Sequence, residues 1–348
     1  MSLSTFDDLV LYPPHCSVYM KKLTYLLYTI ALVSATQLNV TLDSLGWWRL
    51  PISARLVSSG HEVNACVSLD INGNRDFVFE PYQGDNSVPP LVLVDSLIID
   101  DHFSNRIVIP TGHFSIPVFS DPGLWNTVEA SVGAAFDTSF ARRIERFILT
   151  PCGDGSLGLL VLNTPTPEIY AFEGRWFYVN SLNNMGPEIE ASVAVGNNAT
   201  FSPVSFVIVS NVNHTIIPHE AFQEILVHLE RAGFNIVESN HNDELSRCVR
   251  FVRFGTYTTL LILGSSNSEL AQILPPIHFE MVSGTQRFRI SLFPEDYIES
   301  VDHGHTLSIW SKTEGPRYFI GTNVLRRLAF LIDYENHLIG FAEPVDEF

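Results

Sequence analysis

Few residues of this chain have the types and spacing that catalysis or metal binding requires. His278 and the pair His303-Gly-His305 are the best metal-binding candidates, but no carboxylate or cysteine accompanies them at a ligand spacing. Ser156 stands in a Gly-Ser-Leu-Gly segment, which lacks the Gly-x-Ser-x-Gly pattern of a nucleophile elbow. No phosphate-binding loop or dinucleotide fingerprint is present. The sequence therefore predicts neither a metal site nor a cofactor.

The cysteines are too few and too far apart to form a metal site. The four are Cys16, Cys66, Cys152 and Cys248. If Cys16 is removed with a leader peptide, three remain, which indicates buried thiols or one disulfide with one cysteine left over. The sequence leaves the pairing open.

The composition limits the classes of partner. The 348 residues carry a formal net charge of −18, with 46% hydrophobic and 11% aromatic residues. Nucleic acids and anionic membrane surfaces attract basic patches, so we expect neither as a partner. The apolar content is sufficient for packed cores, and we expect a folded chain rather than a disordered one.

Residues 1–35 have the features of a secretory signal peptide, with a basic segment at Lys21-Lys22, an apolar run from Leu23 to Leu32, and a cleavage site at Val33-Ser-Ala35. The true start would then be Met20, with an extension before it, and an uncleaved signal anchor is the alternative. No second apolar run has spanning length, so we expect no further integral membrane span. We predict secretion or residence in the secretory-pathway lumen, with glycosylation sequons at Asn39, Asn198 and Asn213.

The elements that must position any site are mostly strands. Short apolar or alternating runs bounded by Gly, Pro, Asn and Asp dominate the chain, as in Leu157–Leu162 and Phe288–Phe293. Helical periodicity is confined to a few segments, of which Ser139–Phe147 and His219–Arg231 are the clearest. The pattern predicts an all-β fold with a few short helices.

The segment from Tyr318 to Ala342 resembles the C-terminal signature of the pepsin-like aspartic proteases. It has an apolar-Gly stop at Gly321, a short helix over Asn323–Arg327, and Asp333 followed after five residues by Ile-Gly-Phe-Ala. The resemblance implies a two-lobed fold in which Leu325–Ala342 packs beneath the active-site loops. It divides the chain into a divergent, shortened N-terminal lobe (36–166) and a C-terminal lobe (167–348).

Enzymes of that family use two carboxylates about 3 Å apart, one from each lobe, which share a proton and activate a water molecule. Each acid follows an apolar strand and precedes Thr or Ser and then Gly. In the C-terminal half, Phe206–Val209 is such a strand, and Ser210, Asn211 and Val212 follow it. The resemblance thus places Ser210 at the acid position, where its hydroxyl has too high a pKa to act as the base.

The N-terminal half lacks the acid motif as well. The segment Val67–Phe79 resembles the hairpin that precedes the first acid loop, which places Pro81 and Tyr82 at the acid loop itself. A rival placement is Asp95-Ser96, which follows the apolar run Leu91–Val94.

Together these residues imply a non-catalytic relative of the pepsin-like proteases that binds a peptide or protein partner in or near the cleft between the lobes. The first alternative is an aspartic endopeptidase that uses Asp95 with a second acid such as Asp243. The second alternative is a lumenal or surface structural protein.

Overall fold

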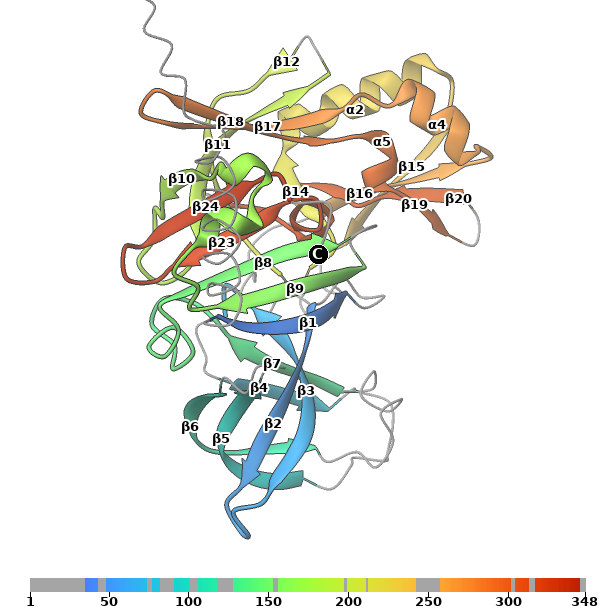
Figure 1. The fold of residues 1–348 in the computed structure, drawn as a ribbon. Coiled ribbons are helices and arrows are strands. Elements are labelled where there is room, and N and C mark those ends of the chain that lie inside the picture. Colours follow the sequence, from blue (N-terminus) through green and yellow to red (C-terminus); the bar gives the residue numbers. More distant parts are fainter. Residues whose placement is uncertain are drawn as a thin grey trace, which may run out of the picture.

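A computed structural model describes most of the chain and shows a mostly-β fold built from two curled sheets of twelve strands each (Figure 1). This confirms the prediction of an all-β class. Several residues named above lie outside the described residues: the leader up to residue 34, Tyr82, Asn198, Asn211, Asp243, Cys248 and His303. The described residues are 35–42, 48–73, 77–81, 91–100, 106–117, 128–152, 156–196, 199–210, 212–241, 257–301, 304–312 and 317–344.

The first sheet combines strands from the N-terminal half with three strands from later in the chain. Its strands are β1 (Thr36–Leu42), β2 (Trp48–Leu56), β3 (Glu62–Asp70), β4 (Phe77–Pro81), β5 (Leu91–Asp100), β6 (Arg106–Pro117), β7 (Val128–Gly133), β8 (Arg146–Cys152), β9 (Leu157–Leu162), β10 (Phe177–Asn180), β23 (Ala329–Asp333) and β24 (Leu338–Ala342). They pair in the order β10-β24-β23-β8-β9-β1-β2-β3-β7-β4, and β5 pairs with β2 and β6. Three strands that follow the expected lobe boundary at 166 thus belong to this sheet.

The second sheet is formed by the residues between β10 and β23. Its strands are β11 (Glu188–Val195), β12 (Ala199–Thr200), β13 (Val204–Ile208), β14 (Thr215–Pro218), β15 (Asn235–His241), β16 (Tyr257–Leu263), β17 (Ile277–Ser283), β18 (Gln286–Leu292), β19 (Ile298–Val301), β20 (Gly304–Leu307), β21 (Ile309–Lys312) and β22 (Tyr318–Ile320). They pair in the order β18-β17-β11-β13-β22-β14-β21-β16-β20-β19, with β12 on β11 and β15 on β16.

The helices are short and lie mainly on the second sheet. They are α2 (His219–Arg231), α4 (Asn267–Ile273), α5 (Pro294–Tyr297) and α6 (Thr322–Leu325), with 3₁₀ turns η2 (Pro167–Tyr170) and η3 (Phe172–Gly174). Helix α2 has the predicted bounds and buries the stripe that its periodicity indicates, including Phe222 and Leu229. Over the described residues, no helix is long and apolar enough to cross a membrane.

The prediction of a helix over Ser139–Phe147 is wrong. Residues 139–143 form turns, and β8 begins at Arg146. Phe147 pairs with Leu162 of β9 and with Ile332 of β23, so the last residues of the segment form a strand of the first sheet instead of a helix.

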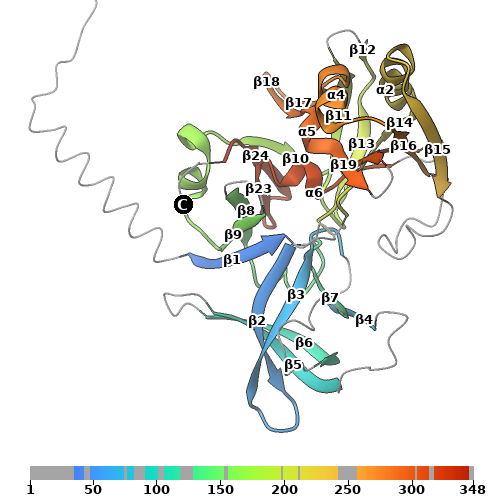
Figure 2. The same ribbon diagram turned by 90° about the vertical axis from the view of Figure 1, so that its right-hand side faces the viewer.

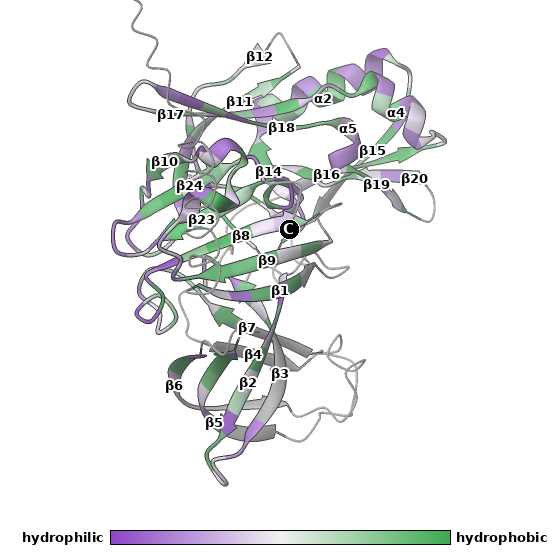
Figure 3. Cartoon of the chain, in the orientation of Figure 1, coloured by the Kyte–Doolittle hydropathy of each residue, from purple (hydrophilic) through white to green (hydrophobic). Residues whose placement is uncertain are grey.

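The strands at the centre of the first sheet are buried on both faces. Phe147, Leu149 and Phe330 belong to the large core, whereas the alternate residues Ile148 and Leu331 pack in a separate cluster with Tyr170 of η2. Because side chains alternate between the two faces of a strand, burial on both faces requires nearly continuous apolar runs. Such runs are visible along β8 and β9 (Figure 3). These strands lie between the β2–β7 part of the first sheet and the second sheet (Figure 1).

Candidate functional site

Each sheet contains the same three-strand motif. In the first sheet, β7 lies between β3, to which it is parallel, and β4, to which it is antiparallel. In the second sheet, β22 lies in the same way between β13 and β14. The outer strands of each motif are consecutive in the chain, so a loop joins them across the end of the inserted strand. The first loop follows Asp70 and the second follows Ile208.

The registers of the two motifs identify corresponding residues. Asp70 pairs with Gly133, the last residue of β7. In the second sheet Ile208 pairs with Ile320, so the next position sets Val209 opposite Gly321, and the N–H of Val209 donates to the Ile320 carbonyl at 3.0 Å. Val209 therefore corresponds to Asp70, and Ser210 corresponds to Ile71.

The two loops meet, and one hydroxyl joins them. The Oγ of Ser210 accepts a hydrogen bond from the N–H of Ile71 at 3.0 Å and donates to the Leu69 carbonyl. All three residues are buried, with Ser210 fully excluded from solvent. Buried backbone groups need partners, so the hydroxyl satisfies two groups of the first sheet from the second.

Asp70 is the carboxylate at this junction. It is 9% exposed, and its Oδ1 accepts the N–H of Asn72 at 3.2 Å. Its Oδ2 lies so close to Gly73 that a Cβ there would come within 2.7 Å of it, so a larger residue at position 73 would force the Asp70 side chain to move. Burial raises the pKa of Asp70 to about 6, although backbone hydrogen bonds from Asn72 and Gly73 act in the opposite direction.

The second loop is fixed by the residues that follow β22. Thr322 donates to the Val212 carbonyl from its N–H at 2.8 Å and from its Oγ1 at 3.0 Å. Gly321 approaches so closely that a Cβ would lie 2.2 Å from the His214 carbonyl. Asn323 and Thr215 are joined by a side-chain hydrogen bond of 2.6 Å. The start of the C-terminal signature thus packs directly against the Ser210 loop.

The structure separates the predicted acid candidates. Ser210 lies at the junction, and Val212 is buried beside it, whereas Pro81 ends β4 in register with Val128. Asp95 and Ser96 lie within β5 at a β-bulge, and the Ser96 hydroxyl donates to Asp95 at 2.8 Å. Strand β5 lies away from the second sheet (Figure 2).

The carboxylate that the structure brings to the junction is Asp70, and not the predicted candidate Asp95. Asp70 is not among the predicted site residues, although it falls inside the segment that was expected to precede the acid loop. The sequence signal for Asp70 is its place at the end of an apolar strand, with Gly73 three residues later.

The remaining predicted positions lie elsewhere. Asn39 is exposed on β1, whereas Asn213 is half-buried and its Nδ2 donates to Glu299 Oε1 at 2.8 Å. Cys152 is a free thiol whose pKa is raised by burial. The described residues contain no cluster of three or more His, Cys, Asp or Glu side chains that could hold a metal ion. His278 and His305 instead lie within hydrogen-bonding distance of serine hydroxyls.

No protein-family model matches the chain, and no curated protein matches its sequence.

Proposed function

We propose that this protein is a non-catalytic relative of the pepsin-like proteases that acts in the secretory pathway by binding a peptide or protein partner beside the junction of its two sheets. The observation that carries the proposal is Val209, because it stands at the position that corresponds to Asp70. A shared-proton mechanism needs an acid and a base on facing loops, and a valine side chain can be neither.

Two features support a pepsin-like arrangement in particular. One is the C-terminal signature, whose Gly321 and Thr322 pack against the Ser210 loop. The other is the repetition of one motif in the two sheets, with its loops joined at Ser210. A fold with one acid loop in each lobe requires this kind of repetition.

Exposed apolar side chains beside the junction favour a peptide or protein as the partner. Leu182 and Met185 are 57% and 53% exposed on the segment between β10 and β11. The same segment touches the first loop, because a Cβ on Gly186 would come within 2.4 Å of Asn72 Oδ1. Neighbouring exposed apolar side chains are typical of interaction sites, and methionine adapts to varied partners.

The absence of catalysis is tested with purified protein and haemoglobin at pH 3–5, with and without pepstatin. We expect no pepstatin-sensitive cleavage. Cleavage would overturn the proposal and favour the endopeptidase alternative, and the variant Asp95→Asn would then test whether Asp95 is its acid.

Partner binding is tested by selecting displayed random peptides against the protein and measuring the selected peptides against two variants. The double variant Leu182→Ser/Met185→Ser should lose binding. The control Val282→Ser, which changes an exposed valine on β17, should retain it. Peptides that bind the double variant as tightly as the unmodified protein would place the binding surface elsewhere.

A further inference from the structure

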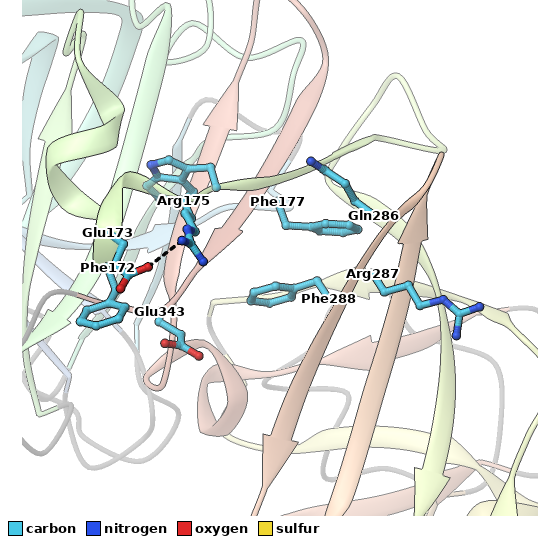
Figure 4. A pocket seen from close by; sticks show the side chains of 9 residues that line it. Phe172, Glu173, Arg175, Phe177, Gln286, Arg287, Phe288 and Glu343 are labelled. Carbon is cyan, nitrogen blue, oxygen red and sulfur yellow. Dashed lines mark ion pairs between the residues drawn. The ribbon is translucent and has the colours of Figure 1, made fainter. Parts of the chain in front are cut away.

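A pocket of about 410 Å³ lies between β10 and β18 (Figure 4). Each of these strands stands at one end of the strand order of its sheet. The pocket is formed by β10 with the preceding turn η3, by β18, and by Glu343, which follows β24. None of the residues of the Ser210 junction lines it. We call it the edge pocket.

The walls of the edge pocket are aromatic. Phe177 and Phe288 stack with ring centroids 5.5 Å apart and ring planes 14° from parallel. Trp176 is held by a hydrogen bond from its Nε1 to the Pro167 carbonyl at 2.8 Å. Phe172 completes the wall and is 50% exposed. These rings offer apolar surface, and their faces attract cations.

Among the residues that the structure describes, the charged groups of the edge pocket leave one carboxylate without an ion-pair partner. Arg175 forms an ion pair with Glu173 at 3.0 Å. Glu343 is anchored beside Phe172, whose N–H donates to its carbonyl at 2.8 Å, but its carboxylate forms no ion pair with any described residue. Arg287 also lines the pocket, but its guanidinium points away from the face on which Phe288 meets Phe177, as Figure 4 shows.

The turn that presents these groups is strained. Glu173 has φ +51° and ψ +22°, a left-handed conformation that is unfavourable for a residue with a Cβ, and Gly174 follows with φ +68°. The two left-handed residues form the tight turn between Phe172 and Arg175. Strain of this kind is concentrated at functional sites in proteins.

We propose that the edge pocket binds the basic side chain of a partner peptide, a lysine or an arginine. The alkyl stem would lie against Phe172 and Phe288, and the cation would approach Glu343 and the faces of the rings. The net charge of −18 attracts a basic partner to the whole surface, whereas the unpaired carboxylate among aromatic rings selects where its side chain is held. This site is separate from the Ser210 junction and does not depend on the proposed function.

The test is a titration of the full-length protein with capped lysine (Nα-acetyl-lysine methylamide), in which binding is measured by ligand-observed NMR. The matched probes are the norleucine analogue, which is neutral and of similar length, and the glutamate analogue. A single exposed charge contact is worth about 1 kcal/mol, so capped lysine should bind about fivefold more tightly than capped norleucine. Capped glutamate should bind most weakly.

Three variants separate a pocket effect from a general attraction. Glu343→Gln should weaken lysine binding about fivefold, whereas Glu230→Gln, a change on the exposed face of α2, should leave it unchanged. Arg175→Ala removes the competing cation and frees Glu173, so it should tighten lysine binding. Equal binding of lysine and norleucine, tighter binding of glutamate, unchanged binding in Glu343→Gln, or weaker binding in Arg175→Ala would each overturn the proposal.

Discussion

Removing the Ser210 hydroxyl is the sharpest test of how the two sheets are joined. In Ser210→Ala, the N–H of Ile71 and the carbonyl of Leu69 lose the group that satisfies them both. Ser210 is fully buried and Leu69 is 1% exposed, so water has no open route to replace the hydroxyl.

The expected loss follows from these two backbone groups. Leaving a buried polar group unsatisfied costs about 1–3 kcal/mol. Relaxation of the loops offsets part of this cost, so we expect the free energy of unfolding to fall by about 2–4 kcal/mol. This would be a large fraction of the total stability of an ordinary domain.

The assay is urea unfolding at pH 7, followed by circular dichroism and tryptophan fluorescence. Ser202→Ala, at an exposed position before β13, is the matched control and should change the stability by less than about 0.5 kcal/mol. Ser210→Cys keeps a side chain of similar size with a weaker donor, so its stability should lie between those of Ser210→Ala and the unmodified protein. If Ser210→Ala is as stable as Ser202→Ala, the hydroxyl does not join the sheets as described.

Four further changes test the charges and the packing. Because the pKa of Asp70 is raised from 3.8 to about 6, the native state binds this proton more tightly, and about 2 kcal/mol of stability is lost as the pH rises from 4 to 6. Asp70→Asn should be more stable than the unmodified protein at pH 7 and flatten this pH dependence, as measured by urea unfolding at pH 4 and 7. Val209→Asp adds a second carboxylate at the corresponding position and should destabilise the protein more at pH 7 than at pH 4. Arg146 holds the pKa of the buried Asp333 below its usual range, so Arg146→Ala should cost about 2 kcal/mol at pH 7 and less as the pH falls through the pKa of Asp333. Phe222→Ala opens a cavity under α2 and should cost about 3–5 kcal/mol in the same assay.

The secondary structure was predictable from the sequence where one local pattern decides it. Helix α2 is amphipathic over its whole length, and it begins and ends at the predicted residues. Ser139–Phe147 has a similar local pattern, but its last residues pair with strands that lie far away in the sequence, including β23. Pairing with distant strands overrides local propensity, and a single sequence does not reveal it.

The residue that corresponds to Asp70 was harder to predict because apolar residues continue past the end of β13. Val209 is apolar and buried, so the sequence pattern assigns it to the strand and gives the following position to Ser210. The structure shows that the β13 ladder ends at Ile208 and that Val209 packs with Val212 and Ile216 in a small separate cluster. The contact that defines the junction joins residues 139 positions apart, and no local pattern encodes it.

The fold constrains Ser210 and Gly321 in a different way from position 209. Ser210 and Gly321 are required by the fold, because one satisfies two buried backbone groups and the other allows a backbone approach that no side chain permits. Nothing in the packing requires a carboxylate at position 209, where a buried charge would cost stability and the valine gains about 1.5 kcal/mol or more from burial. Under the proposal of a non-catalytic protein, the fold accounts for Ser210 and Gly321, and nothing in the packing opposes a valine at position 209; Asp70, which remains buried at the corresponding position, is not explained by packing alone.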